Sequence, residues 1–170
     1  PSGTEVELKA GHLKQLKSPS RVYLEDVVLR VFAKDGATCD RFTTDKAEFD
    51  TQKAILYAGG EVQIDTGEPV AGNPPGNRVS IVTSGLTFDS TSGRAETDRA
   101  AAFRFDQGEG KSVGASYDPG YRELQLHSQA EVIWRGKEGG AVPLRVEAQE
   151  LIYKERDSAI VLPAKSRLTR

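Results

Sequence analysis

Apolar and polar residues alternate with a period of two along most of the chain. Alternation of this kind lines one face of a pleated strand with apolar side chains and leaves the other face polar. The segments that show it include residues 54–57, 61–64, 79–81, 86–88, 103–105, 124–126, 132–134, 144–146 and 160–162. Short strands with turn signals about every 8–12 residues are typical of a sandwich, a barrel or an open roll. The pattern therefore predicts an all-β protein.

The turns between these segments carry a recurring aspartate. Asp50, Asp89 and Asp118 each follow an aromatic residue at the end of an expected strand. An aspartate carboxylate accepts hydrogen bonds from backbone amides two or three residues further on, which starts a turn. Turn chemistry thus explains the recurrence without a catalytic or calcium-binding role. Two longer loops, at residues 66–77 and 136–140, are interpreted as excursions between hairpin strands.

A helix competes with a strand only near the beginning of the sequence. Leu13 and Leu16 are three residues apart among good helix formers, and Pro19 would end such a helix. We prefer a strand at residues 6–8 as the prediction for this segment.

Four segments of the chain share one plan of strand, turn and strand. Each has an aromatic residue before its turn, and Phe49, Phe88, Tyr117 and Tyr153 follow one another at intervals of 39, 29 and 36 residues. A fifth, weaker copy begins near Val6. Repeats near this length indicate one supersecondary unit stacked on its neighbours, because a single unit cannot bury its apolar face alone. Stacking would create a continuous core or a continuous groove.

Composition and charge narrow the function classes. The chain has 170 residues, enough for a core, and we expect a single domain over residues 1–170. Its net charge of −2 gives no reason to expect a nucleic-acid partner. No apolar run approaches the ~18 residues of a membrane-spanning helix. Because the sequence starts at Pro1 and contains no methionine, we expect a processed product or a fragment of a longer chain.

No group of residues points to catalysis or to a metal site. His12 and His127 are the only histidines, and neither has a metal-ligand spacing. The one cysteine, Cys39, is expected to be a small strand residue. Gly110-Lys111-Ser112 matches the end of a phosphate-binding loop, but Phe105 stands where the first glycine belongs, so we interpret the segment as a hairpin turn. We therefore expect no enzyme, no metal and no cofactor.

Several degenerate motifs follow one another in a fixed order. Residues 47–50, 60–64 and 83–89 read Ala-x-Phe-Asp, Gly-x-Val-x-Ile and Thr-x-x-Leu-x-Phe-Asp. In this order they resemble the LptA/LptC/OstA-like family of lipopolysaccharide-transport proteins. Residues 24–36 are similar to the start of an LptC domain, and residues 96–126 resemble its second half. The likeness covers roughly residues 22–134, and residues 144–168 form one further unit of the same kind.

The resemblance implies a fold, a ligand and a location. The implied fold is an open, V-shaped β-jellyroll of antiparallel strands in two facing sheets. Family membership implies that lipid A acyl chains lie between the sheets and that related proteins stack through edge strands, giving a head-to-tail assembly. It also implies the periplasm of the cell envelope, often with an N-terminal inner-membrane anchor that this sequence lacks. Whether the chain is LptC-like, LptA-like or part of a longer repeat protein stays open.

Fourteen apolar residues are candidates to line such a groove. They come from the alternating segments on either side of the expected turns. The candidates are Ile55, Tyr57, Val62, Ile64, Ile81, Leu86, Phe88, Phe103, Phe105, Tyr117, Leu124, Leu126, Val132 and Trp134.

Two other hypotheses remain beside the lipid carrier. One is a scaffold of β-repeats that binds proteins through its edge strands and never holds lipid, which a dry and fully packed interior would favour. The other is an enzyme or lectin on a β-jellyroll, which would need a polar pocket with a clustered acid pair or a metal.

Overall fold

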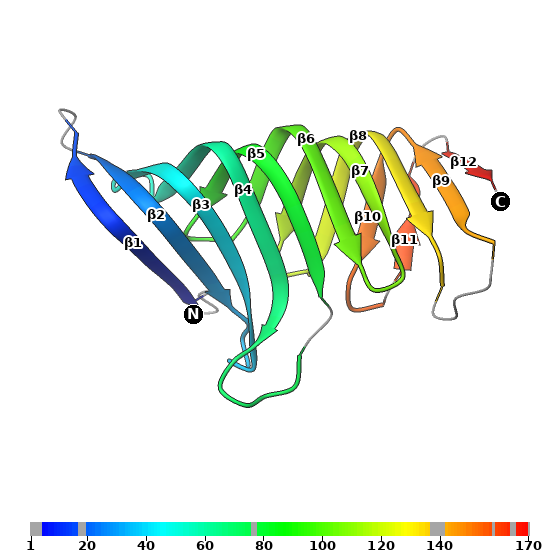
Figure 1. Ribbon diagram of the computed structural model, residues 1–170, viewed down its shortest axis with the longest axis horizontal. Coiled ribbons are helices and arrows are strands. Elements are labelled where there is room, and N and C mark those ends of the chain that lie inside the picture. Colours follow the sequence, from blue (N-terminus) through cyan, green and yellow to red (C-terminus); the bar gives the residue numbers. More distant parts are fainter. Residues whose placement is uncertain are drawn as a thin grey trace.

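The computed structural model describes residues 5–16, 20–75, 78–136, 142–157, 159–163 and 166–169. Within these ranges the regular secondary structure is entirely β (Figure 1). The strands are β1 (Glu5–Gln15), β2 (Arg21–Phe32), β3 (Thr38–Asp50), β4 (Ile55–Pro69), β5 (Val79–Asp89), β6 (Ala95–Phe105), β7 (Gly108–Asp118), β8 (Glu123–Trp134), β9 (Leu144–Ala148), β10 (Leu151–Lys154), β11 (Ala159–Val161) and β12 (Ser166–Thr169).

The strands form one continuous antiparallel sheet, in which most strands pair with the strands that precede and follow them in the sequence. Each strand from β1 to β8 pairs with its neighbour in sequence. β8 then pairs with both β9 and β10, which are two halves of one strand path interrupted at residues 149–150. β10 pairs with β11, and β9 pairs with β12. The all-β, antiparallel prediction is confirmed, and the sheet is open because its first and last strands do not pair.

A row of β-bulges crosses the middle of this sheet. The register shifts between Thr44 and Glu48, and the same happens near residues 58–61, 82–87, 97–100 and 111–113. A bulge bends its strand and strengthens the local twist. Gly85 and Gly114 have φ angles of 60° and 80° on this row, a region that glycine enters without steric cost. The whole sheet therefore folds over along one line.

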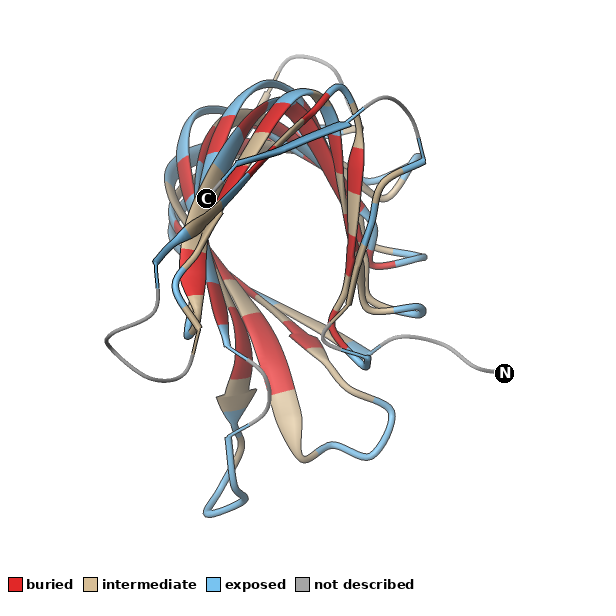
Figure 2. Cartoon of the chain, turned by 90° about the vertical axis from the view of Figure 1, so that its right-hand side faces the viewer, coloured by how far each residue is buried: buried red, intermediate tan, exposed pale blue. Residues whose placement is uncertain are grey.

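The bend divides the sheet into two walls that face each other. Wall A consists of residues 27–32, 38–44, 61–69, 79–83, 100–105, 108–112, 130–134, 144–148 and 166–169. Wall B consists of residues 21–25, 47–50, 55–58, 86–89, 95–97, 115–118, 123–128, 151–154 and 159–161. Seen along its long axis, the sheet curls around a common interior (Figure 2). The two facing sheets expected from sequence are thus halves of one sheet.

The bulges also decide which side chains face the interior. In β5 the buried positions are Val79, Ile81 and Thr83 before the bend, but Leu86 and Phe88 after it. The buried positions change from odd to even residue numbers because an extra residue in a strand turns every later side chain to the other face. Without the extra residue, the second half of β5 would present its apolar side chains to solvent.

The predicted turn chemistry is confirmed at all three aspartates. Asp50 Oδ1 accepts hydrogen bonds from the amides of residues 52 and 53, both at 3.0 Å. Asp89 Oδ1 accepts from residues 91 and 92 at 2.8 and 3.3 Å, and Asp118 Oδ1 from residues 120 and 121 at 2.9 and 3.4 Å. Each carboxylate therefore starts the turn that follows its strand.

Other local predictions were confirmed in part. The preferred strand at residues 6–8 is present, and β1 extends through the segment for which a helix competed. The loop expected at residue 66 begins later, because β4 continues to Pro69, and residues 76–77 lie outside the described chain. Residues 137–140 of the second loop also lie outside it. The interpretation of residues 110–112 as a turn was wrong, since they lie inside β7.

We expect Gly108→Ala to destabilise the fold by about 1–3 kcal/mol, the usual cost of overpacking a close-packed site. A Cβ atom at this position would collide with the backbone carbonyl of Ile133 in the paired strand. Gly60→Ala is the matched control, because a Cβ atom there meets nothing within 4 Å. Denaturant unfolding measures both changes. Equal stability of the two variants would contradict the β7–β8 register.

Candidate functional site

The inner face of the folded sheet brings together most of the candidate groove residues. Twelve of the fourteen have positions on this face, and ten of those twelve are buried, with exposed fractions from 0% at Leu126 to 6% at Leu86. Phe105 and Trp134 are half-buried. The interior is thus a continuous apolar surface that runs from β2 to β10.

Two candidates lie on the opposite face. Ile55 and Tyr57 alternate with buried Leu56 and Ala58, and Tyr57 is 45% exposed. Because successive side chains of a strand point to opposite faces, these two side chains point away from the interior. Residues 54–57 are all apolar, so either set of alternate residues could face the interior. The prediction from sequence chose the set that faces outward.

The inner face also contains residues that sequence reasoning did not select. β2 contributes a complete row that continues the apolar surface toward the N-terminal end, and further members come from every strand between β3 and β10. The additional buried residues of this hydrophobic core are Val22, Leu24, Val27, Leu29, Val31, Phe42, Ala47, Leu56, Ala58, Val79, Ala95, Ala101, Ala115, Ala130, Val146, Ala148, Leu151 and Tyr153. In β2 the same alternation marks them, but it changes phase at Asp26, a non-glycine residue with a φ of 52°.

Aromatic contacts join the two walls across the interior. Phe42 of wall A and Phe88 of wall B have ring centroids 5.2 Å apart. Phe105 of wall A and Tyr153 of wall B stack at 5.8 Å. These distances lie within the 4.5–7 Å range of aromatic pairs. Together with the low exposure of the inner side chains, they show that the walls pack directly against each other in this state.

Several partly exposed apolar side chains lie toward the C-terminal end of the interior. Phe105 packs on Trp134 with ring centroids 5.6 Å apart and on Phe103 at 6.1 Å. Gly108 and Gly110 face these rings from β7 and leave room for them, since a Cβ atom at either position would collide with its neighbours. Leu144, Ile160 and Leu162 also pack on the core while staying partly exposed. Half-buried apolar residues therefore form a mouth at this end.

A buried polar cluster crosses from one wall to the other. It consists of Asp40 and Thr66 in wall A, Tyr117 in wall B, Arg122 in the β7–β8 turn and Glu155 in the β10–β11 turn. Asp40 Oδ1 accepts a hydrogen bond from the Gly67 amide at 3.0 Å. Arg122 donates to Glu155 Oε2 from both Nε and Nη2, each at 3.1 Å. Hydrogen bonds of Tyr117 with Asp40 and of Thr66 with Glu155 cross between the walls, which are therefore joined by polar as well as apolar contacts.

The carboxyl groups of this cluster have perturbed acidities. Burial raises the pKa of Glu155 to about 7, although the Arg122 guanidinium partly opposes the rise. Burial also raises the pKa of Asp40, against the hydrogen bond from the Gly67 amide. The pKa of Tyr117 rises because of burial and the two neighbouring carboxylates. Perturbed groups of this kind mark candidate functional sites.

The described residues give no support to a metal centre or a membrane-spanning helix. Among them, no three His, Cys, Asp or Glu side chains come together in a group that could hold a metal ion. No helix in the described ranges is long and apolar enough to cross a membrane. Cys39 lies buried in β3, where burial raises the pKa of its thiol.

Comparison with known proteins gives one family match. The family model described as "Lipopolysaccharide-assembly, LptC-related" matches residues 1–134. No curated protein sequence matches the chain. Among solved structures, LptH from Pseudomonas aeruginosa, described as the LptA-homologous periplasmic component of the lipopolysaccharide transport device, is 11% identical. The alignment covers 100% of this chain and 99% of that one, with a TM-score of 0.36. At that score the likeness supports no argument about this chain.

Truncation of a side chain on each face tests the assignment of inner and outer surfaces. We expect Phe88→Ala to reduce the free energy of unfolding by about 3–5 kcal/mol, because it removes a ring that is 1% exposed and contacts Phe42. We expect Tyr57→Ala to change it by about 0.5 kcal/mol or less, as at most surface sites. Chemical denaturation of both variants provides the comparison. A large loss at Tyr57 with a small one at Phe88 would reverse the assignment.

Proposed function

Because the chain belongs to the LptC-related family of lipopolysaccharide-assembly proteins, we propose that it carries lipopolysaccharide through the periplasm. In this proposal the acyl chains of lipid A lie between wall A and wall B. The protein supplies an apolar path and performs no chemistry on the lipid. It is therefore a carrier and not an enzyme.

The observation that carries this proposal is the continuous apolar inner face with its mouth of half-buried residues. Burial of each methylene group of an acyl chain contributes about 0.8 kcal/mol. Apolar contact along an acyl chain thus favours binding between the walls, although one chain alone is held only reversibly. We propose that the twelve inner-face candidates contact the lipid and that Ile55 and Tyr57 do not.

The closed packing of the interior sets a condition on this function. The inner side chains of the two walls bury each other, so acyl chains enter only when the walls separate. Phe105 and Trp134 are half-buried at the C-terminal mouth, so part of their surface is already accessible. We propose that lipid enters or leaves the interior at this mouth.

The open sheet also supplies surfaces for partner proteins. β1 pairs with β2 on one side only, and most of its residues are exposed. An edge strand of this kind offers unpaired backbone groups to which another chain can add a strand. We propose that other lipopolysaccharide-transport proteins bind at the edges of the sheet, which would let head-to-tail stacking join neighbouring interiors into one path.

A charged residue at the mouth tests lipid binding directly. We expect Phe105→Asp to weaken lipid A binding about tenfold or more, because the carboxylate must be desolvated in an apolar path. Phe105 is only half-buried, so the fold should survive, and thermal melting checks this. Tyr57→Asp, on the outer face, is the matched control. Native mass spectrometry of both variants with added lipid A gives the bound fractions.

A second candidate function has one observation in its favour. The dense packing of the interior also suits a scaffold that binds proteins through its edge strands and holds no lipid. The same mass spectra discriminate between the two. A one-to-one lipid A adduct in the unmodified protein supports the carrier. Oligomers that grow with protein concentration, without any adduct, would support the scaffold and overturn the carrier.

A further inference from the structure

We propose that Asp40, Thr66, Tyr117, Arg122 and Glu155 form a proton-controlled latch that sets how readily the two walls separate. The inference deepens the proposed function, since it concerns access to the same interior, and it rests on that function for its biological meaning. The five residues are called the latch below.

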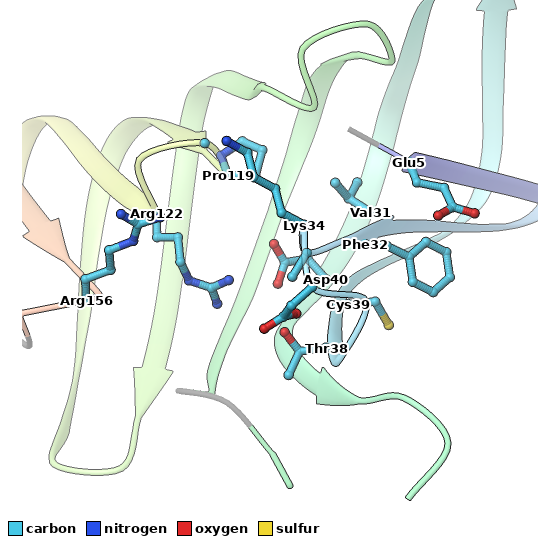
Figure 3. A pocket seen from close by; sticks show the side chains of 13 residues that line it. Glu5, Val31, Phe32, Lys34, Thr38, Cys39, Asp40, Pro119, Arg122 and Arg156 are labelled. Atoms are coloured by element: carbon cyan, nitrogen blue, oxygen red, sulfur yellow. The ribbon is translucent and has the colours of Figure 1, made fainter. Parts of the chain in front are cut away.

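The latch is placed to hold the walls together. Tyr117 of wall B donates a hydrogen bond to Asp40 of wall A. Thr66 of wall A donates to Glu155, which lies in the turn after the last residues of β10 in wall B. Separation of the walls would break both bonds. In Figure 3 the side chains of Asp40 and Arg122 extend toward each other from opposite sides of a pocket.

When both carboxyls are ionised, the five residues of the latch carry a net charge of −1. Asp40 is 5% exposed and Glu155 1% exposed, and one guanidinium, that of Arg122, lies between them. The single hydroxyl proton of Tyr117 is shared between the two carboxyls: it hydrogen-bonds Glu155 Oε2 at 3.5 Å and also Asp40. Two buried carboxylates that share one guanidinium are costly to ionise together. One bound proton restores neutrality within the five residues of the latch.

A neighbouring pocket gives solvent access to the latch. This pocket has a volume of about 350 Å³, and both Asp40 and Arg122 line it. The other charged groups along it are Glu5, Lys34, Asp35 and Arg156, all of which are exposed and so screened by water. The pocket therefore gives protons a route to the latch, while the buried groups determine its charge balance.

The direction of the pH effect follows from the acidity of Glu155. With the walls closed its pKa is about 7, whereas separation would return it to water and toward its ordinary value of 4.5. The closed state therefore binds the proton more tightly than the open state does. As a result, the stability of the closed state relative to the open state decreases as the pH rises through 7. For these two pKa values, wall opening becomes about tenfold more favourable between pH 6 and pH 8. The raised pKa of Asp40 acts in the same direction.

Amide hydrogen exchange of the lipid-free protein measures this opening. We expect protection factors in β7 and β10 to fall about tenfold from pH 6 to pH 8 in the unmodified protein. In Glu155→Gln, which keeps the shape of the side chain but never ionises, they should change less than about twofold. Asp40→Asn removes the excess charge from the other side of the latch and should also weaken the pH dependence.

Glu131→Gln is the matched control. Glu131 pairs with Arg145 at 3.2 Å and is 22% exposed, but it lies outside the latch. This variant should keep the pH dependence of the unmodified protein. His12 and His127 are exposed and are unchanged in every variant, so they contribute equally to each comparison. Unaltered pH dependence in both Glu155→Gln and Asp40→Asn, with normal melting temperatures, would overturn the latch.

Lipid exchange separates the latch from the proposed function. If the chain carries lipid A, release of bound lipid should be about tenfold faster at pH 8 than at pH 6, and Glu155→Gln should abolish the difference. The same pH dependence in the variant would contradict the latch while leaving the carrier intact. Failure of lipid A to bind at either pH would contradict the carrier, and the protection factors would still decide the latch.

Discussion

The row of β-bulges across the sheet is the constraint on which the rest of the structure depends. A twelve-stranded meander without it would twist as an open ribbon and leave one apolar face in water. Because each strand bends at nearly the same place, the two halves of that face meet. The bulges also reset the phase of alternation, so that both halves present apolar residues inward. Core, mouth and latch all follow from this single fold line.

Sequence alone was enough for the class of fold and for the three turns that begin with an aspartate. Alternation located the strands, and the aspartates after Phe49, Phe88 and Tyr117 cap turns as expected. Alternation could not locate the bulges, because an inserted residue looks the same in sequence as the end of a strand. For the same reason the phase at Ile55 and Tyr57 was ambiguous. The latch was invisible, since Asp40 and Glu155 are 115 residues apart and only the folded sheet brings them together.

A lipid carrier needs an apolar interior, and the protein also has to stay soluble when no lipid fills that interior. In this protein the two walls pack on each other, as in the contacts between Phe42 and Phe88 and between Phe105 and Tyr153. The interior is therefore protected from water, and in the proposed carrier lipid would replace wall-to-wall contacts with wall-to-lipid contacts. A seam that contains charged groups is easier to open than a wholly apolar one, because those groups are well solvated once the walls separate.

Photo-crosslinking tests most directly whether lipid lies between the walls. A photoreactive phenylalanine analogue would replace Phe105 on the inner face in one variant and Tyr57 on the outer face in another. After illumination with lipopolysaccharide, the carrier account predicts an adduct at position 105 and little or none at position 57. Equal labelling at the two positions, or none at position 105 in a folded protein, would contradict the claim that this sheet encloses lipid.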